Sequence, residues 1–467
     1  MLEGLEIVEI KLHELKKGSK IFRIDSTFFN RRVYSIDLLI KSKPHFFIQE
    51  NNIVSGPFGS TLTSHSYLQS GIPFVRIENI KGGFNINTSE MVYISEENNT
   101  ILKNSQLHID DLILSKVGNS IGYYARVDED IKQCNISENN IGIKLKEYSI
   151  CMKHYILTYL NSKFGYDLTI RRISGNAQPK LNVFDISEIP IPVFSEKFYS
   201  TISHVVLDSK EKIKQSNSLY RQAEELLLET IGLKDFQPAQ ENINIKSFSE
   251  SFLSTGRLDA EYYQPKYEEI ISKVKQKGYD LLGNLVSIKK SIEPGSDAYS
   301  DEGVSFLRVA DYNKFGISDP EKKLSDNFCN DNRTLIDSLK PKKETILFSK
   351  DGSVGTAYML REDADFITSG AILHLTVKNK DILPEYLTLA LNSKVVQQQA
   401  ERDAGGSIIL HWRINEIENV VVPVVDYKIQ QQIAELVEKS FYLCGESKRL
   451  LNEAKDMVEN EIEKGNN

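Results

Sequence analysis

The sequence predicts an internally duplicated protein of mixed α and β structure (α+β or α/β), in which two long helices separate two homologous domains. Three observations predict it. Short segments of the first half recur, in the same order, in the second half. A long amphipathic helix follows each half. The apolar and small residues of the two helices lie alternately three and four residues apart and match at an offset of 231 positions, as Ile202 and Ile433 do.

Length and composition are those of a globular protein with two or more domains. The chain has 467 residues, of which 40% are hydrophobic and 26% are charged. Lys and Arg together number 57 and Asp and Glu number 65, for a formal net charge of −8. Any contact with nucleic acid must therefore come from local basic clusters, while acidic surface elsewhere is available to a protein partner.

The N-terminal region and the cysteines predict a cytoplasmic protein. The first residues, MLEGLEIVEIKLHEL, carry acidic side chains where a secretory signal needs basic ones. No apolar run approaches the roughly 20 residues needed to span a bilayer. Cys134, Cys151, Cys329 and Cys444 are scattered, without CxxC spacing or a histidine at metal-ligand distance, which is typical of thiols in a reducing compartment.

The duplicated segments begin near the N-terminus and predict strands around glycine turns. RIDSTFF (23–29) recurs as RLDAEYY (257–263), which keeps the Arg, the Asp and the paired aromatic residues. The next pairs are GIPFVRIENIKGGF (71–84) with GVSFLRVADYNKFGI (303–317), and LILSKVGNSIGYYARV (112–127) with ILFSKDGSVGTAYML (346–360). The last pair indicates a strand, a Gly-rich turn and a second strand in each half.

A helix, a polar loop and an extended segment complete each half. YILTYLNSK (155–163) and YLTLALNSK (386–394) have helical spacing and share LNSK. Polar loops follow, RRISGNAQPKL and ERDAGGSIILHW. The apolar runs ISEIPIPV (186–193) and INEIENVVVPV (414–424) then contain Pro190, Pro192 and Pro423, which favour an edge strand or an extended connector over a central strand.

The two long helices are predicted over residues 198–231 and 429–462. Ser209, Ser216 and Ala223 match Ser440, Ser447 and Ala454, as expected if the helices pack with their backbones close. Two unrelated amphipathic helices are the alternative. Lys212 against Leu443 is the one mismatch along the line. The predicted packing and partner-docking positions are Ile202, Val205, Leu219, Leu226, Ile433, Leu436, Leu443, Leu450 and Met457.

Catalytic motifs are weak in this sequence. Ser115-Lys116 and Ser349-Lys350 have three possible interpretations. Each pair could supply a nucleophile, could lie in a turn that binds phosphate through Lys and backbone amides, or could lie in a purely structural turn. Glu321-Lys322-Lys323 with Asp311 loosely fits a metal-dependent nuclease, but also a solvated charge run. Because GxxxxGK[ST], GxGxxG and the Asn/Asp-Pro-Pro-aromatic motif are absent, the chain is not expected to be an enzyme on its own.

Polar and basic side chains gather in the two loops that follow the LNSK helices. Arg, Asn and Gln make bidentate contacts to base edges, while Lys and Ser more often hold phosphates. The alternative is a hydrated surface loop with Trp412 in the core. Together with the glycine turns, the loops give these candidate DNA contacts: Ser60, Arg76, Lys116, Asn119, Arg171, Arg172, Ser174, Asn176, Gln178, Lys180, Arg308, Lys350, Arg402, Ser407, His411 and Arg413.

The combination of repeats resembles the DNA-specificity subunit of type I restriction-modification systems along essentially the whole chain. The resemblance rests on SGPFGSTL with GIPFVRIENI, on LILSKVGNSIG, on GNAQPKLNVFDISEIPIPV, on RLDAEYYQPKY and on the two long helices. The second half departs from the pattern, because SIEPGSDAY stands where the first half has SGPFGSTL, and its later loop lacks the Gln-Pro pair.

The resemblance implies a phage-defence complex in which this chain recognises double-stranded DNA and has no catalytic role. It implies target-recognition domains at 1–195 and 234–426, and spacer helices at 196–233 and 427–467 that pack antiparallel and dock two methyltransferase subunits. S-adenosylmethionine would bind those partners, ATP and Mg²⁺ would serve restriction subunits, and no metal is expected in this chain. A related two-component restriction system, a duplicated adaptor that never touches DNA and an autonomous nuclease are the alternatives.

Helix length supports a spacing role. A helix of about 32 residues is about 48 Å long, and major-groove faces on one side of DNA recur every 34–36 Å or so. Domains at the two ends of such a spacer are expected to read half-sites about one turn apart.

Overall fold

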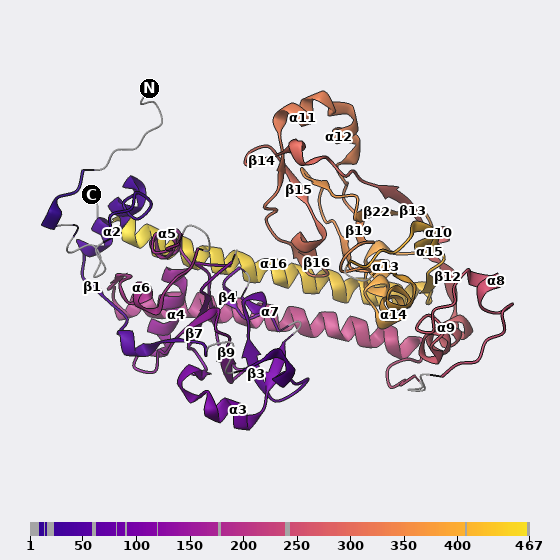
Figure 1. Ribbon diagram of the computed structural model, residues 1–467, viewed down its shortest axis with the longest axis horizontal. Coiled ribbons are helices and arrows are strands. Elements are labelled where there is room, and N and C mark those ends of the chain that lie inside the picture. The colour runs from indigo at the N-terminus through magenta and orange to yellow at the C-terminus, as the bar shows by residue number, and fades with distance from the viewer. Residues whose placement is uncertain are drawn as a thin grey trace. The chain divides into compact units, whose positions relative to one another are not determined.

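The computed structural model describes residues 9–464 except for 14, 16–22, 58–61, 81, 89–90, 119, 176–178, 239–242 and 407–408 (Figure 1). The chain forms two compact units. Unit 1 comprises Met1–Lys212 with Glu446–Asn467, and unit 2 comprises Ile213–Gly445. Each unit mixes helices with sheets, as predicted. The four-segment division at 195, 233 and 426 stays a prediction, because the compact units divide each long helix between them.

Unit 1 contains two main sheets and one strand pair. The five-stranded sheet has the order β2-β10-β7-β8-β4, the four-stranded sheet β5-β3-β9-β6, and β1 pairs with β11. The strands are β1 (His45–Phe46), β2 (Ile53–Ser55), β3 (Ile72–Val75), β4 (Phe84–Asn85), β5 (Val92–Ile94), β6 (Leu107–His108), β7 (Leu112–Ser115), β8 (Tyr124–Arg126), β9 (Gln133–Ile136), β10 (Asn140–Ile143) and β11 (Ile191–Pro192).

Helices of unit 1 pack against the larger sheet. Tyr155, Tyr159 and Leu168 on α4 and α5 join Leu112 and Leu114 of β7 in one buried cluster. The helices are α2 (Arg31–Lys41), α3 (Glu96–Ile101), α4 (Ile150–Leu160), α5 (Lys163–Ile170), α6 (Val183–Ser187) and α7 (Glu196–Thr230), of which α7 continues into unit 2.

Unit 2 contains two four-stranded sheets, in the orders β13-β22-β19-β20 and β14-β18-β15-β21. The pairs β12-β23 and β16-β17 are separate. The strands are β12 (Tyr279–Leu281), β13 (Val286–Lys290), β14 (Tyr299–Ser300), β15 (Val304–Leu307), β16 (Tyr312–Asn313), β17 (Gly316–Ile317), β18 (Lys323–Leu324), β19 (Ile346–Ser349), β20 (Ala357–Met359), β21 (Ile367–Thr368), β22 (Ile372–Val377) and β23 (Val421–Pro423).

Helices of unit 2 cover its first sheet in the same chain order. Tyr386 and Val396, on α13 and α14, share a buried cluster with Phe348 of β19. The helices are α8 (Phe252–Thr255), α9 (Pro265–Lys277), α10 (Leu282–Leu285), α11 (Asp326–Asp331), α12 (Arg333–Leu339), α13 (Pro384–Leu391), α14 (Lys394–Asp403), α15 (Ile414–Glu418) and α16 (Tyr427–Glu463), of which α16 continues into unit 1.

The LNSK sequences form the same contacts in each unit. Asn161 accepts from the backbone N–H of Tyr124 at 3.0 Å and donates to its carbonyl at 2.9 Å. Asn392 exchanges the same two bonds with Ala357, at 3.0 and 2.8 Å. The asparagine therefore ties the end of the helix to the second strand of the glycine turn, which explains why this short sequence recurs.

The proline-containing runs form edge strands, which confirms the prediction. β11 and β23 each pair with a single strand, because proline cannot donate to a further ladder. The hydroxyl of Tyr155 donates to the carbonyl of Pro192 at 2.7 Å, and that of Tyr386 donates to the carbonyl of Pro423 at 2.8 Å. Each hydroxyl thus holds the extended run before its long helix.

The buried line along each long helix follows the predicted one at half or more of its positions and is shifted by one residue at the others. On α7 the buried residues follow Ile202, Val206, Ser209, Ser216, Tyr220, Ala223 and Leu227, whereas Val205, Leu219 and Leu226 are only half-buried. The line on α16 follows Ile433, Val437, Ser440, Ser447, Ala454 and Val458. At the shifted positions two adjacent residues are both apolar, so the sequence pattern could not show which of the two is buried. Leu443 and Leu450 are buried as predicted, and Leu436 and Met457 are half-buried.

Pairs of buried serines join α7 to α16 within each unit. In unit 1, Ser209 Oγ lies 2.9 Å from Ser447 Oγ and donates to the Ser447 carbonyl at 3.0 Å. In unit 2, Ser216 donates to the Ser440 carbonyl at 2.7 Å, and Ser440 donates to the Ser216 carbonyl at 2.8 Å. A side chain that reaches the opposite backbone requires closely spaced helices, as the small residues predicted.

Two buried histidines make the stability of the fold sensitive to acid. His154 contacts Ser203 Oγ at 2.8 Å in unit 1, and His374 contacts Thr368 Oγ1 at 2.8 Å in unit 2. Burial lowers the pKa of each from 6.5 to about 4. The unfolded chain therefore takes up these protons first, and the stabilisation present above pH 6.5 or so is lost as the pH falls toward about 4.

We expect each histidine to cost about 1–2 kcal/mol of unfolding free energy between pH 7 and pH 5. Urea unfolding of His374→Gln and of the unaltered protein at the two pH values measures this contribution, because Gln does not titrate there. The variant should show the smaller loss. An equal loss in both proteins would mean that His374 is charged in the folded state.

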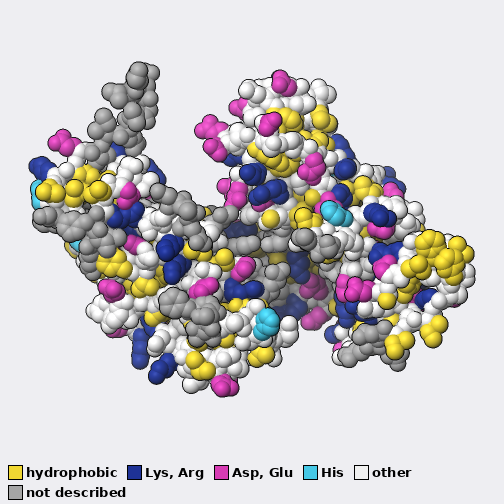
Figure 2. Space-filling view, in the orientation of Figure 1, with side chains coloured by type: hydrophobic (Ala, Val, Ile, Leu, Met, Phe, Trp, Pro, Cys, Tyr) yellow, Lys and Arg dark blue, Asp and Glu magenta, His cyan; other side chains and the backbone are white. Residues whose placement is uncertain are grey.

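One exposed surface of unit 2 is apolar. Figure 2 shows apolar side chains gathered over the segment around α8, at the right edge of the view. Phe248 and Phe252 stack there with ring centroids 5.4 Å apart. The exposed large apolar residues of this segment are Ile243, Ile245, Phe248, Phe252, Leu253 and Leu258. No helix in the described part of the chain is long and apolar enough to cross a membrane.

Candidate nucleic-acid interface

In unit 1, backbone pairing brings together two of the predicted DNA-contacting stretches. These are the described residues of the turn between β7 and β8 (115–118 and 120–122), and the paired segments 173–175 and 179–181 after α5, which we call the hairpin. Together they form the first loop pair. The backbone N–H of Leu181 donates to the carbonyl of Lys116 at 3.0 Å, and Val117 is bridged to Lys180. Ser174 and Lys180 exchange backbone hydrogen bonds of 3.0 and 2.9 Å, which close the hairpin.

Unit 2 builds the second loop pair in the same way, from the turn 349–356 and from the paired segments 404–406 and 409–412, its hairpin. The backbone N–H of Trp412 donates to the carbonyl of Lys350 at 2.7 Å, and Asp351 is bridged to His411. Gly405 and His411 exchange backbone hydrogen bonds of 3.1 and 2.8 Å. Lys350 thus takes the place of Lys116, Asp351 that of Val117, and His411 that of Lys180.

Glycine is required where the turn of each loop pair meets the following helix. Gly122 has a φ of 93°, and a Cβ built there would lie 2.8 Å from the ring of Tyr166 and from the side chain of Ile170. Gly355 has a φ of 83°, and its Cβ would lie 3.0 Å from Gln397. A larger residue would push the turn away from the helix, so these glycines hold each turn beside its hairpin.

Basic side chains of the loop pairs differ in exposure and partners. In unit 1, Lys180 is exposed and Lys116 is half-buried. In unit 2, Lys350 forms an ion pair with Asp351, and His411 Nδ1 lies 2.9 Å from Asp351 Oδ1. His411 itself is exposed. In both loop pairs a lysine of the turn therefore lies beside a Lys or His of the paired segment, and such groups suit contact with a phosphate backbone.

Arg171 and Arg172, both predicted to contact DNA, are buried in unit 1. Arg171 Nε donates to the Phe28 carbonyl at 2.6 Å, and its Nη1 pairs with Asp37 at 3.1 Å. Burial lowers the pKa of both arginines, while Asp37 opposes that shift.

Arg172 is tied to the backbone. It is 1% exposed and donates to the carbonyls of Leu168 and Glu188, each at 2.6 Å. Burial of both guanidinium groups, together with their bonds to interior carbonyls, favours a structural role over the predicted base contacts.

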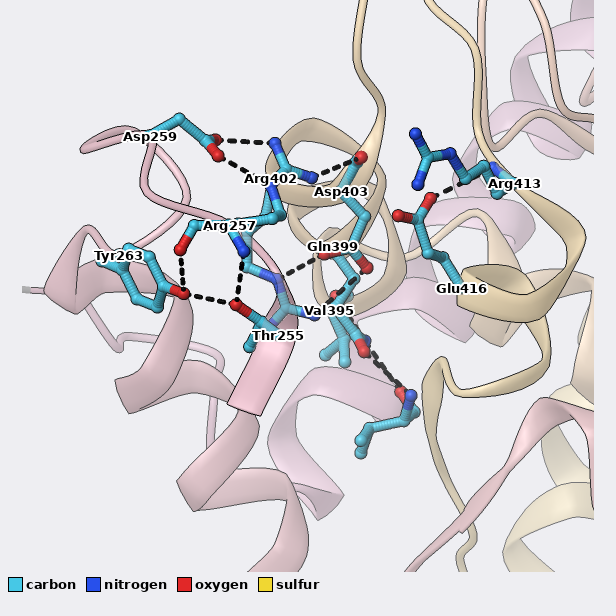
Figure 3. A network of polar contacts seen from close by, with 11 residues as sticks. Thr255, Arg257, Asp259, Tyr263, Val395, Gln399, Arg402, Asp403, Arg413 and Glu416 are labelled. Atoms are coloured by element: carbon cyan, nitrogen blue, oxygen red, sulfur yellow. Dashed lines mark hydrogen bonds and ion pairs between the residues drawn. The ribbon is translucent and has the colours of Figure 1, made fainter. Parts of the chain in front are cut away.

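Arg402 of unit 2 takes part in a related network (Figure 3). Arg402 Nε pairs with Asp403 Oδ1 at 2.6 Å, and its guanidinium lies 5.0 Å from the ring centre of Tyr262. Arg257 contacts the other end of this network, since it donates to the Asp403 carbonyl at 3.0 Å and pairs with Asp259. Arg402 therefore joins the segment 257–263 to α14 and is only partly accessible.

The same network explains the RIDSTFF repeat. In unit 1, Arg23 donates to the Arg172 carbonyl at 2.9 Å and pairs with Asp25 at 2.8 Å. The guanidinium groups of Arg23 and Arg171 lie 4.8 and 4.0 Å from the ring centre of Phe28. The repeated Arg, Asp and aromatic residues therefore fasten a segment early in each half to the end of the helix before the hairpin.

Three other predicted arginines lie outside the loop pairs or at their edge. Arg76 follows β3 beside a hollow of about 370 Å³ that Tyr67, Phe74 and Asn139 also line. Arg308 follows β15 and pairs with Asp311 at 3.3 Å and with Glu321 at 3.6 Å. Arg413 is exposed at the start of α15 (Figure 3).

Five predicted contacts are outside the described residues, and Ser174 is half-buried in the first hairpin. The five are Ser60, Asn119, Asn176, Gln178 and Ser407.

Two residues in or beside the loop pairs, Asp351 and Asn139, were not predicted from the sequence. Asn139 accepts from the backbone N–H of Lys116 at 2.7 Å, through its carbonyl. The repeated segments SKVG (115–118) and SKDG (349–352) differ at their third residue, and this difference was the one signal for Asp351. Its role could not be read from the sequence, because it depends on His411, sixty residues further on.

The serines next to the two lysines are placed as structural groups. Ser115 is fully buried, and Ser349 accepts from the backbone N–H of Thr356 at 2.9 Å. Glu321 of the charge run pairs with Arg308. Among the described residues, no cluster of His, Cys, Asp and Glu is arranged to hold a metal ion. These placements favour the turn interpretation over the nucleophile interpretation.

Part of the chain matches a known protein family. Residues 281–455 match the type I restriction modification DNA specificity domain. A curated relative, the type I restriction enzyme EcoBI specificity subunit of Escherichia coli, is 23% identical over 231 residues. That alignment covers 46% of this chain and 48% of the relative, so the chain spans about half the length of the curated relative it matches.

Two solved structures are similar over most of their length. The S subunit of a type I restriction-modification system from M. genitalium has 14% sequence identity and a TM-score of 0.35, with 89% of this chain and 93% of that chain covered. The HsdS subunit from Thermoanaerobacter tengcongensis has 14% identity and a TM-score of 0.27, with coverages of 90% and 94%.

Proposed function

We propose, from the premise that this chain is related to the specificity subunits of type I restriction-modification systems, that it recognises a bipartite sequence in double-stranded DNA. Unit 1 would read one half-site and unit 2 the other. The observation that carries the proposal is the recurrence of the loop pair. Lys116 is hydrogen-bonded to Leu181, the residue after Lys180, and Lys350 is hydrogen-bonded to Trp412, the residue after His411. Lysines commonly hold phosphates, and polar side chains of the neighbouring loops would supply contacts to base edges.

The internal duplication is part of this proposal. Sheet orders β2-β10-β7-β8 and β13-β22-β19-β20 correspond strand for strand, and the asparagine, tyrosine and arginine contacts recur with them. The two serine pairs are also related by the offset of 231 positions, since Ser209 and Ser447 correspond to Ser440 and Ser216. These relations support a pseudo-two-fold arrangement with α7 and α16 as an antiparallel coiled coil.

Catalysis is assigned to partner subunits. Two methyltransferase subunits that bind S-adenosylmethionine would dock along the long helices, and restriction subunits with ATP and Mg²⁺ would complete a cytoplasmic complex. The exposed apolar segment around α8 provides further surface for a protein contact, because DNA offers few apolar groups to cover it. The specificity subunit of a two-component restriction system fits the same chain, and the neighbouring genes distinguish it.

Methylation-sensitive sequencing of host DNA tests the proposal. We expect one methylated bipartite motif that disappears when this chain is deleted and the methyltransferase genes are kept. A non-DNA adaptor, which the net charge of −8 and the apolar segment favour, predicts an unchanged methylome. Binding of the assembled complex to duplex DNA that weakens steeply with salt would also argue against the adaptor.

The length of the two helices is expected to set the gap between half-sites. The compact units meet within α7 between Lys212 and Ile213, and within α16 between Gly445 and Glu446. One heptad inserted at each position keeps the buried line in phase and lengthens each helix by about 10 Å. This corresponds to about three base pairs at 3.4 Å or so each.

Host methylome sequencing with the double insertion should show both half-sites unchanged and a gap longer by about three base pairs. The matched control inserts the heptad into α7 alone, which shifts one serine pair out of register and should abolish methylation. A double insertion that methylates with the original gap would contradict the spacer role.

A further inference from the structure

Asp351 lies at the contact between the two parts of the second loop pair. Its carboxylate is paired with Lys350 Nζ through Oδ2 and contacts His411 Nδ1 through Oδ1 at 2.9 Å. Backbone bridging between Asp351 and His411 fixes this arrangement, so the three side chains meet at one edge of the turn. One carboxylate therefore engages both of the groups through which unit 2 would approach DNA.

The first loop pair has no equivalent carboxylate. Val117 stands at the position of Asp351, and Lys180 at that of His411. Within the part of the chain that the structure describes, neither Lys116 nor Lys180 forms an ion pair. Two lysines with solvent access in one unit thus correspond, in the other, to a lysine and a histidine held by an aspartate. The two units share backbone geometry but differ in local charge.

This difference has a direct electrostatic consequence at a DNA surface. A phosphate that approaches Lys350 also approaches Asp351, and like charges about 4 Å apart in water repel by about 1 kcal/mol. To contact a phosphate, Lys350 must also leave its partner. The second loop pair therefore gains little from sequence-independent phosphate contact, whereas Lys116 and Lys180 are available for it.

We propose that Asp351 is a specificity-determining residue of unit 2, which withholds Lys350 and His411 from non-specific phosphate contact. The proposal rests on the DNA-binding function proposed above. Unit 1 then supplies most of the non-specific affinity, and unit 2 contributes when favourable base contacts offset the repulsion. An unfavourable group that acts against the wrong ligand is an established route to specificity.

Asp351→Asn tests this role, and Val117→Asp is its reciprocal in unit 1. The full-length chain, co-purified with its methyltransferase partners, is titrated against fluorescent duplexes between about 50 and 200 mM NaCl. One duplex carries the sequence that the host methylates, and the other is scrambled. Asp351→Asn frees about one phosphate contact, which steepens the slope of log K against log salt by about 0.9. Over this range the variant should lose about 3- to 4-fold more affinity than the unaltered complex.

The two variants have opposite expected results. Asp351→Asn should bind the scrambled duplex more tightly at low salt and lower the ratio of specific to non-specific affinity. Val117→Asp should weaken binding to both duplexes and flatten the salt slope, because the new carboxylate lies beside Lys116 and Lys180. Thermal unfolding of each variant shows whether the loop pair remains folded, and Val117→Asp gives the answer if Asp351→Asn does not fold.

Different results overturn the two proposals. An unaltered complex that binds neither duplex overturns the DNA-binding function, and this inference with it. An unaltered complex that binds with a normal salt slope, together with variants that keep this slope and the same specificity ratio, overturns the role of Asp351 alone.

Discussion

Replacing Arg172 by Ala should destabilise unit 1 by about 3–5 kcal/mol. The guanidinium is 1% exposed, and its two hydrogen bonds satisfy the carbonyls of Leu168 and Glu188. Removal leaves both carbonyls without a donor, creates a cavity and takes one counter-charge away from buried Asp37. The sequence alone predicted a DNA contact for Arg172, and its burial makes a loss of stability the expected effect of this substitution.

Urea unfolding of the full chain measures this cost, and Arg413→Ala is the control. Arg413 is exposed, so its truncation should change the unfolding free energy by less than about 0.5 kcal/mol. Because unit 1 and unit 2 have separate cores, the transition of unit 1 should move while that of unit 2 stays. An Arg172→Ala protein with unchanged unfolding and a lost half-site would restore the base-contact role.

Replacing Ser216 by Leu should destabilise the helix pair of unit 2 by about 2–4 kcal/mol. Ser216 and Ser440 are both buried, and each hydroxyl donates to the carbonyl of the other, at 2.7 and 2.8 Å. A branched side chain between helices that lie this close forces them apart and also removes the hydrogen bond that Ser216 donates. The neighbouring layers at Tyr220 and Val437 would lose contact as well.

Lys214→Leu is the matched control for Ser216→Leu. It introduces the same side chain two positions earlier on α7, where the residue is exposed, so crowding should not occur. Ser216→Ala removes the hydroxyl without adding volume and should cost about 1 kcal/mol. Differential scanning calorimetry ranks the three variants. If Ser216→Leu is no less stable than Ser216→Ala, the helices are farther apart at this layer than the hydrogen bonds indicate.

Local patterns predicted much of the secondary structure, because the relevant contacts are short in sequence. The Gly-rich turn between β7 and β8 and the edge strands with Pro192 and Pro423 follow from backbone rules that a few residues express. Both long helices lie within two residues of their predicted ends. Repetition strengthened each prediction, since a contact such as that of Asn161 must recur at Asn392.

The roles of single charged residues could not be predicted in this way. Arg171 looks like a surface residue in RRISGNAQPKL, and its partner Asp37 lies far away in the chain on α2. The same applies to Asp351, which acquires its role only when His411 is folded beside it. Which residues of the long helices are buried was ambiguous for another reason. Val205 and Val206, for example, are equally apolar, and only packing selects between them.

Unit 1 is assembled from two stretches of chain that are separated by the whole of unit 2. Ala454, Val458 and Ile462 of α16 lie in the same buried cluster as Tyr155 and Ile202. During synthesis, the apolar residues in the first half of α7 therefore stay exposed until the ribosome has made unit 2 and then residues 446–464, which cover them. The N-terminal unit, although translated first, is completed last, and a nascent chain halted after Gly445 would expose these residues to chaperones or to aggregation.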